Sequence, residues 1–355
     1  RTDRRALGHT THWITLHAPA QNFKQMQMSQ INQREETGTE NSDMFISSAS
    51  SGENSWWRYI LMSIAPFLAS NTIGFVPYFI VWAIYSYKGK LVYSGYSPDF
   101  AASGINLNLS FVLMLFPFLM ALVTFILLMK PMHNRKFGTV INGGIPIRWG
   151  RILTSALVWV VLSSLYLYTS IKQHPSDFVI NNTTGSLYVI ALLAIIMIPF
   201  QAAFEEVLFR GYLMQGFAIL TKNRWMPILI TSLFFGLMHS INPEMKAYGF
   251  WTMLPQYVMF GIVFAIATML DDGIEIGIGA HAANNIFLSV FLTTKSSALQ
   301  TPALYMQVTS YPWKEFAGQV VNSVIFLAIM FIIFRWKDIS KLYGKVIVVK
   351  ERVAA

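Results

Sequence analysis

The segment "LYVIALLAIIMIPFQAAFEEVLFR", residues 187–210, decides the class of fold. Its apolar part, from Leu187 to Phe204, approaches the ~20 residues that a helix needs to cross a bilayer. Two adjacent glutamates and an arginine follow it directly. Because an ionised side chain near the bilayer centre costs ~2.5–3.5 kcal/mol, we expect these three charged groups to be compensated or to serve a purpose.

The rest of the chain has the composition of a membrane protein. Of its 355 residues, 54% are hydrophobic and 12% are charged, whereas a soluble domain carries about a quarter charged residues. The net charge of +9 lies in loops and tails, without a basic helix or an aromatic–basic platform, so nucleic acid is not an expected partner. The absence of cysteine excludes disulfides, thiolate nucleophiles and cysteine-ligated zinc.

Apolar runs of spanning or nearly spanning length predict an all-α fold, a polytopic membrane helical bundle with about eight transmembrane helices. None of the runs alternates as the strands of a membrane barrel do, and no internal repeat indicates the inverted halves of a transporter. The runs cover about residues 58–85, 107–129, 152–170, 187–215, 226–241, 251–270, 276–294 and 316–334.

The N-terminal segment, residues 1–55, differs in composition from the rest of the chain. It is polar and rich in Gln, Ser, Asn, Thr and Glu, a composition that predicts a disordered tail. Arg4 and Arg5 do not form a convincing twin-arginine signal, because no apolar segment follows them. Since the sequence begins with Arg1 and its methionines start only at residue 26, we expect part of this tail to lie outside the natural chain.

Lysines and arginines in the loops predict the orientation in the membrane. With eight spans, ten of them fall on one side and six on the other. This bias predicts an integral, multi-pass membrane protein with both termini in the cytoplasm. The cytoplasmic set is Lys130, Arg135, Lys136, Arg148, Arg151, Lys222, Arg224, Arg335, Lys337 and Lys341, and the opposite set is Lys88, Lys90, Lys172, Lys246, Lys295 and Lys314.

Ionisable residues inside the predicted spans are concentrated in three of them. The fourth span contains Glu205, Glu206 and Arg210, the fifth contains His239 and the seventh contains His281. Given the cost of charge in lipid, scattered positions facing acyl chains are not expected. We therefore predict that these side chains converge on a single hydrated cavity.

Helical spacing separates the two glutamates. Glu206 and Arg210 are four residues apart and share a helix face, so they are predicted to neutralise each other. Glu205 lies about 100° away around the helix, which leaves its carboxylate able to face the cavity. The pair of Glu206 and Arg210, taken alone, is explained by structure.

The two histidines also have partners at helical spacing. Phe235 and His239 are four residues apart, as are His281 and Asn285, and the face around His281 is rich in Gly and Ala. That small face suits tight helix packing or an approaching peptide backbone. Each residue alone has a structural interpretation: a membrane histidine or asparagine often bridges helices, and Phe235 is expected to pack.

Together these groups suit hydrolysis of an acyl bond. Glu205, with His239, is placed to hold and deprotonate a water. Asn285 and His281 can donate hydrogen bonds to a tetrahedral oxyanion, worth ~3–4 kcal/mol for each donor. No serine lies in a nucleophile elbow, and neither an HExxH nor a GxxxxGK[ST] motif occurs.

The segments "EEVLFR" (205–210), "FGLMH" (235–239) and "HAANN" (281–285) resemble, in this order, the EExxxR, FxxxH and HxxxN/B motifs of the CPBP family. These are the CAAX-protease and bacteriocin-processing intramembrane endopeptidases, which include the type II CAAX prenyl endopeptidases. The resemblance covers roughly residues 150–335. It implies that Glu205 and His239 activate the water, that His281 and Asn285 stabilise the oxyanion, and that Glu206 and Arg210 support the site beside Phe235.

On this basis the chain divides into four parts: the tail over 1–55, two transmembrane helices within 56–130, a CPBP-like protease core over 131–340, and a cytoplasmic C-terminal tail over 341–355. The expected partners are the lipid bilayer and a membrane-associated or hydrophobic peptide or protein, with prenylated CAAX-type substrates left open. No cofactor is expected for the glutamate–water mechanism.

Three alternatives remain. The same Glu/His/His set is able to ligate zinc, as in a metalloprotease, although this leaves no separate general base except Glu206. A second alternative is a catalytically silent scaffold or sensor that uses the motifs as a polar packing network. A proton-coupled transporter is the third, and it lacks the expected repeats.

Overall fold

The computed structural model describes residues 44–94, 97–99, 102–181 and 184–346. Most of the predicted N-terminal tail and the end of the predicted C-terminal tail lie outside the described residues. The longer helices are α3 (Trp56–Ala69), α4 (Val76–Tyr87), α5 (Leu107–His133), α7 (Trp149–Gln173), α8 (Thr184–Glu206), α10 (Trp225–Met238), α12 (Phe250–Asp271), α13 (Glu275–Phe291) and α14 (Pro312–Phe334). The short helices and turns are α2 (Met44–Ser47), η1 (Ser48–Ser51), η2 (Ser70–Gly74), α6 (Thr139–Asn142), η3 (Pro175–Asp177), η4 (Val207–Leu213), α9 (Met214–Thr221), α11 (Pro243–Tyr248) and η5 (Ile339–Leu342).

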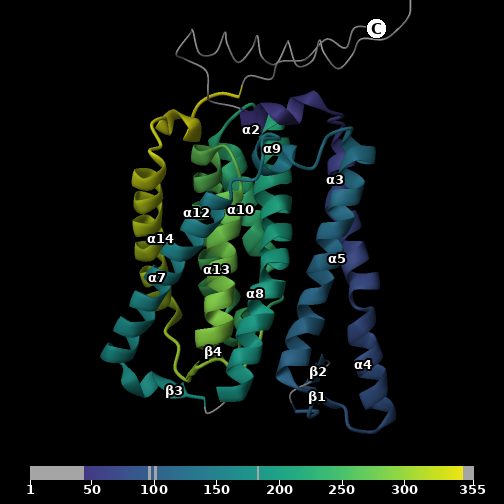
Figure 1. The fold of residues 1–355 in the computed structure, drawn as a ribbon, viewed down its shortest axis with the longest axis vertical. Helices are drawn as coiled ribbons and strands as arrows, with labels where there is room; N and C mark the ends of the chain where they lie inside the picture. The colour runs from purple at the N-terminus through teal and green to yellow at the C-terminus, as the bar shows by residue number, and fades with distance from the viewer. Residues whose placement is uncertain (1–43, 95–96, 100–101, 182–183, 347–355) are drawn as a thin grey trace, which may run out of the picture. The chain divides into compact units, whose positions relative to one another are not determined.

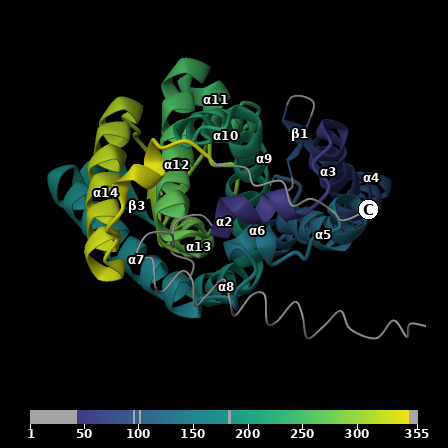
Figure 2. The same ribbon diagram turned by 90° about the horizontal axis from the view of Figure 1, so that it is seen from above.

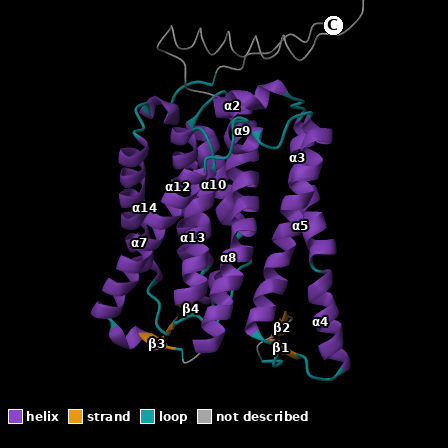
Figure 3. Cartoon of the chain, in the orientation of Figure 1, coloured by secondary structure: helices purple, strands orange, loops and turns teal. Residues whose placement is uncertain are grey.

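This helical content confirms the predicted polytopic bundle (Figure 3). Among the described residues, six helical stretches are long and apolar enough to cross a membrane. The fifth and seventh predicted runs form the shorter helices α10 and α13. The stretch Gly185–Thr221 joins α8, η4 and α9 over 37 residues. At 1.5 Å per residue it is ~55 Å long, well beyond the ~30 Å hydrocarbon core of a bilayer.

Helix α13 lies inside the bundle, packed against α7, α8 and α12 (Figures 1 and 2). Helix α5 packs against α8 and α3, and α14 packs against α12 and α7. Small residues allow close contact between α13 and α7. A Cβ added at Gly279 would clash with the carbonyl oxygen of Ile152, so the predicted small face serves helix packing at this position.

The bundle has two chemically different ends (Figure 1). At one end α5, α9, α12 and α14 finish while α7, α10 and α13 begin, and the arginine-rich connection 130–151 lies there; we call it the basic end. At the other end, which we call the strand end, lie β1 (Val92–Ser94), β2 (Ser97–Asp99), β3 (Phe178–Ile180), β4 (Leu292–Thr294) and β5 (Tyr305–Gln307).

A small sheet at the strand end ties distant connections together. Its strand order is β3–β5–β4, with β3 antiparallel and β4 parallel to β5. In register, Val179 and Thr293 both pair with Met306. The sheet thereby links the connection between α7 and α8 to the connection between α13 and α14.

The boundary of the predicted tail is wrong for residues 44–55. Phe45 and Ile46 are buried in the core at the basic end, and the carbonyl oxygen of Phe45 accepts a hydrogen bond of 2.7 Å from Gln215. Phe45 and Ile46, which lie at the end of a polar stretch of sequence, anchor this segment to the core. The unit that contains the bundle therefore begins at Met44.

The C-terminal boundary also differs from the prediction of 340. Lys341 forms an ion pair with Asp272, Lys345 bridges to Asn223 and Val346 is buried. The described chain thus remains packed against the bundle to Val346, and residues 347–355 lie outside the described part.

Candidate active site

The predicted site residues meet in one cavity of about 410 Å³. Its walls come from α5, α8, α12, α13 and the end of α10. Glu205, His239, His281, Asn285 and Phe235 all line it. Of the five ionisable groups predicted to converge on one cavity, Glu205, His239 and His281 line it, whereas Glu206 and Arg210 are completely buried and do not.

Glu206 and Arg210 form the predicted pair. Nη1 of Arg210 donates to Oε1 of Glu206 at 2.8 Å, and both side chains are completely buried. The guanidinium lies 4.2 Å from the ring centre of Phe235. In this cation–π contact the aromatic ring covers one face of the guanidinium. Phe235 therefore packs, as predicted, and its neighbour is the buried arginine.

Glu205 is held by an uncharged partner. Its Oε1 accepts a hydrogen bond of 2.6 Å from Nε2 of Gln201. Its Oε2 has no hydrogen-bond donor and lies 3.6 Å from Nε2 of His281. One oxygen thus fixes the orientation of the carboxylate, while the other is buried without a hydrogen-bond donor.

His281 connects the two glutamates, a role that helical spacing within one span does not reveal. Its Nδ1 lies 2.8 Å from Oε1 of Glu206. Because a carboxylate paired with arginine only accepts hydrogen bonds, Nδ1 carries a proton. The ring is also stacked on Phe264, with centroids 5.6 Å apart, so Nε2 is directed toward Glu205 by contacts on two sides.

His239 follows directly after α10, which ends at Met238 and not at the predicted residue 241. Its Nδ1 lies 2.7 Å from the carbonyl oxygen of Phe235, an acceptor, so Nδ1 donates this hydrogen bond. Its ring stacks on Tyr257 at 4.3 Å between centroids. In the neutral ring Nε2 is then a free proton acceptor.

Gln201 is a site residue that was not predicted. It accepts a hydrogen bond of 2.9 Å from Nδ2 of Asn285 while it donates to Glu205. Asn285 in turn accepts from Asn284 at 3.0 Å, and Asn284 accepts from the indole of Trp159 at 3.1 Å. The indole only donates and the carboxylate only accepts, so the orientation of every amide between them is fixed.

A signal for Gln201 was present in the sequence. It is a polar residue inside an apolar run, four positions before Glu205, and a pair at this spacing shares a helix face. Its second partner, Asn285, is 84 positions away, and only the packing of α8 on α13 brings the two together.

The side chains that the zinc alternative requires do not form a ligand set. The Nδ1 atoms of His239 and His281 are engaged with a carbonyl and with Glu206, and Glu206 is committed to Arg210. In the part of the chain that the structure describes, no three His, Asp or Glu side chains are grouped so as to hold a metal ion. The Nε2 atoms of both histidines and Oε2 of Glu205 are not engaged in these hydrogen bonds, so the choice between water alone and a zinc-bound water stays a prediction for chelation to test.

Comparison with known proteins gives a family for the segment that carries these residues. Residues 184–287, from α8 to α13, match the family described as "Type II CAAX prenyl endopeptidase Rce1-like". The chain is also similar to "Uncharacterized protein YyaK" of Bacillus subtilis (strain 168), with 31% identity over 279 residues, 77% of this chain and 91% of that protein. No solved structure matches the chain significantly.

Proposed function

Because this chain belongs to the Rce1-like family of type II CAAX prenyl endopeptidases, we propose that it is an intramembrane endopeptidase that cleaves peptides with a water activated by Glu205 and His239. The family and the apolar helices together make it a multi-pass membrane protease. The mechanism and the substrate are the parts that we propose.

One observation supports the mechanism most strongly. Of two adjacent buried glutamates, Glu206 is neutralised by Arg210, whereas Glu205 is held by a neutral amide with one oxygen lacking a donor. Glu205 is therefore the glutamate with an oxygen left without a protein donor, which a general base needs in order to take a proton from water.

The reaction begins with a water between Glu205 and His239. A proton of this water passes to Oε2 of Glu205, and the oxygen attacks the carbonyl carbon of the scissile bond. His239, through its free Nε2, accepts a hydrogen bond from the same water and orients it. When the C–N bond breaks, the proton held by Glu205 passes to the leaving amine, which restores the carboxylate.

The oxyanion of the tetrahedral intermediate is stabilised by His281 and Asn285. With one proton committed to Glu206, His281 donates from Nε2 only as an imidazolium, and the two neighbouring carboxylates balance that charge. Asn285 uses one N–H for Gln201, which leaves its second N–H for the oxyanion. Such donors contribute ~3–4 kcal/mol each to transition-state stabilisation.

The proposed substrate is a membrane-associated or hydrophobic peptide, and prenylated CAAX ends are one class to test. Purified protein in liposomes is incubated with a library of membrane-tethered peptides, and the products are identified by mass spectrometry. We expect cleavage by the wild type, and a loss of about 10²–10⁴-fold in Glu205→Gln, the range for removal of a general base.

The matched control is Glu53→Gln, an exposed carboxylate that lies 3.8 Å from Arg58, and its turnover is expected to stay at the wild-type level. Cleavage by Glu205→Gln at the wild-type rate would refute the mechanism. If the wild type cleaves nothing and Glu205→Gln unfolds, the residues form a structural polar network and the protein is a scaffold.

Chelation distinguishes the water mechanism from the zinc alternative. Because the proposed mechanism activates the water with Glu205 and His239 alone, we expect turnover to persist after extended dialysis against EDTA and 1,10-phenanthroline. Loss of turnover that zinc alone restores, and magnesium or calcium do not, would contradict this expectation.

A further inference from the structure

Helix α12 places one aromatic ring against each of the two histidines of the site. Phe264 stacks on His281 with 5.6 Å between the ring centroids, and Tyr257 stacks on His239 with 4.3 Å. The two aromatic residues are seven positions apart, which puts them on one face of the helix, two turns from each other. A phenylalanine suffices for the contact with His281, so stacking on a histidine does not by itself require the hydroxyl of Tyr257.

The stack on His239 depends on a close approach of α12 to α10. A Cβ added at Gly236 of α10 would clash with the side chain of Val258 on α12, so only a glycine allows this spacing. His239, three residues after Gly236, also contacts the ring of Phe235, with centroids 4.7 Å apart. Its imidazole is therefore oriented by one aromatic ring from each helix.

The hydroxyl of Tyr257 accepts one hydrogen bond and has no acceptor for its own proton among the described residues. Nδ2 of Asn242 donates to it at 3.2 Å. Asn242 is placed by the turn after α10, where its backbone N–H donates to the carbonyl oxygen of His239 at 3.0 Å. A phenol both accepts and donates, and Tyr257 and Asn242 line the active-site cavity. The proton of Tyr257 is thus available to a group bound in that cavity.

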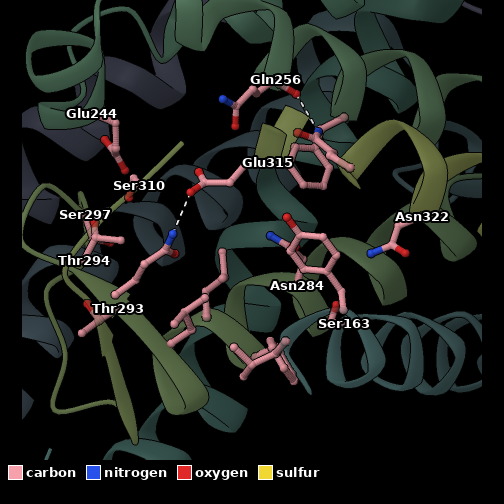
Figure 4. A pocket seen from close by; sticks show the side chains of 18 of the residues that line it. Ser163, Glu244, Gln256, Asn284, Thr293, Thr294, Ser297, Ser310, Glu315 and Asn322 are labelled. Atoms are coloured by element: carbon pink, nitrogen blue, oxygen red, sulfur yellow. Dashed lines mark hydrogen bonds between the residues drawn. The ribbon is translucent and has the colours of Figure 1, made fainter. Parts of the chain in front are cut away.

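A tyrosine of a neighbouring cavity provides a contrast. This second cavity, of about 290 Å³, adjoins the active-site cavity and shares Glu244 and Gln256 with it (Figure 4). Tyr248 lines the second cavity, and its hydroxyl donates to Oγ of Ser310 at 3.2 Å. The proton of Tyr248 is therefore used within the protein, whereas that of Tyr257 is not.

Tyr257 and Asn285 lie on the same side of the contact between Phe264 and His281. Helix α13 begins at the basic end and α12 finishes there, so the two helices run in opposite directions. At 1.5 Å per residue, Asn285 is ~6 Å beyond His281 along α13, and Tyr257 is ~10 Å before Phe264 along α12. Both displacements lead toward the strand end, which puts Tyr257 on the side of His281 where Asn285 lies.

We propose that Tyr257 is a further catalytic residue, whose hydroxyl donates a hydrogen bond to the oxyanion of the tetrahedral intermediate beside His281 and Asn285. The proton stays on the phenol oxygen, so the transfer from water to Glu205 and on to the leaving amine is unchanged. An oxyanion accepts stronger hydrogen bonds than the neutral carbonyl from which it forms, so the contribution of Tyr257 appears in kcat. This role rests on the proposed function.

Tyr257→Phe removes the hydroxyl and keeps the ring that stacks on His239. We expect kcat to fall by about 10²–10³-fold, the range for removal of one oxyanion donor, with KM and the unfolding temperature nearly unchanged. Tyr248→Phe is the matched control and is expected to retain wild-type kinetics. A wild-type kcat in Tyr257→Phe, or a raised KM with an unchanged kcat, would overturn the role.

Asn242→Asp tests the direction of the hydrogen bond while Tyr257 stays in place. An ionised carboxylate only accepts hydrogen bonds, so it takes the hydroxyl proton that the amide leaves available. We expect Asn242→Asp to lower kcat in the presence of Tyr257 and to cause no further loss in Tyr257→Phe, where the hydroxyl is absent. An equal loss in both backgrounds would assign the effect to the added charge and contradict the role of the hydroxyl.

Two uncleavable peptides give a readout that needs no turnover. Both are built on the sequence that the wild type cleaves best: a phosphinic peptide carries a charged oxygen in tetrahedral geometry, and a reduced-amide peptide has no oxygen at the scissile position. Isothermal titration calorimetry in detergent measures their affinities. We expect Tyr257→Phe to bind the phosphinic peptide about 10–100-fold more weakly than the wild type does, the range for a hydrogen bond to a charged group, and to bind the reduced amide equally well.

The outcomes separate the role of Tyr257 from the endopeptidase activity. Undiminished affinity of Tyr257→Phe for the phosphinic peptide, or equal losses of affinity for both peptides, would overturn the role of the hydroxyl while leaving the activity in place. A wild type that cleaves no peptide of the library would refute the proposed function, and with it the role that rests on it.

Discussion

Glu205 and Glu206 are adjacent in sequence and have different partners in the structure. Glu206 shares a helix face with Arg210 and is tied to it. Glu205 faces Gln201 and the cavity. The separation follows from the 100° turn between neighbouring helical residues, so this division could be predicted from spacing alone.

Substitution of Gln201 tests its role in positioning Glu205 and Asn285. Gln201→Leu removes the hydrogen bond to Glu205 and the acceptor for Asn285 without introducing charge. We expect kcat to fall by about 10–100-fold, as for a small misplacement of catalytic groups, with KM nearly unchanged. Steady-state kinetics on the purified variant measure both, and Gln300→Leu, an exposed position, is the control.

A double-mutant cycle separates positioning from loss of stability. If Gln201 acts by orienting Glu205 and Asn285, then Gln201→Leu should lower kcat much less in an Asn285→Ala background than in the wild type. Fully additive losses, or an equal fall in the amount of folded protein, would assign Gln201 a purely structural role.

The contacts between site residues of different helices were beyond prediction from one sequence. The bond between His281 and Glu206 spans 75 positions, and that between Asn285 and Gln201 spans 84. Spacing within one helix predicts which side chains share a face, but the partner across the interface is set by the packing of α8 on α13.

At the scale of the elements, the contact of α13 with α7 positions His281. Gly279 lies against the backbone of Ile152 and the hydroxyl of Ser155. The carbonyl of Ile152 and the buried helix α13 cannot move apart without losing packing contacts. Gly279 therefore determines how closely α7 and α13 approach each other.

Gly279→Ala is therefore expected to separate α7 from α13. Overpacking of this kind costs ~1–3 kcal/mol, and the displacement of His281 should lower turnover as well. Thermal unfolding in detergent measures the stability. The control is Gly150→Ala on α7, where an added Cβ meets no atom within 4 Å; equal unfolding temperatures for the two variants would refute the packing role.

Element types were predicted more accurately than element ends. All eight predicted runs contain helix, because long apolar runs in lipid have few other options. The wide helical turn η4 (Val207–Leu213), directly after the glutamates, was not foreseen, since its apolar sequence resembles any α-helical turn. Such turns are frequent at functional sites, and at Gly211 this one lies against the backbone of Val140.

At the scale of the whole molecule, a polar cluster around Arg148 joins helices at the basic end, and two adjoining cavities lie between the helices. The loop charges predicted an orientation, but the two cavities could not be predicted because their walls come from connections and helices far apart in the chain. The polar cluster at the basic end was not predicted either. Its central residue, Arg148, appears in the sequence as one of several basic residues in the connection 130–151.

Arg148→Met tests whether the polar cluster stabilises the basic end of the bundle. It leaves the buried carboxylate of Glu275 without its closest cation and weakens the hold on Asp271, and breaking a buried pair costs ~3–5 kcal/mol. We expect a lower unfolding temperature in detergent than for Lys337→Met, an exposed position at the same end. Equal unfolding temperatures would show that the cluster does not hold the basic end together.

The most direct test compares Glu205→Gln with Glu206→Gln, using peptide turnover and thermal unfolding on the same preparations. We expect Glu205→Gln to unfold near the wild-type temperature with turnover abolished, because its partner is a neutral amide. Glu206→Gln leaves Arg210 buried without its carboxylate, and we expect the lower unfolding temperature there. A stable, active Glu205→Gln, or one that unfolds like Glu206→Gln, would contradict the assignment of Glu205 to chemistry and Glu206 to structure.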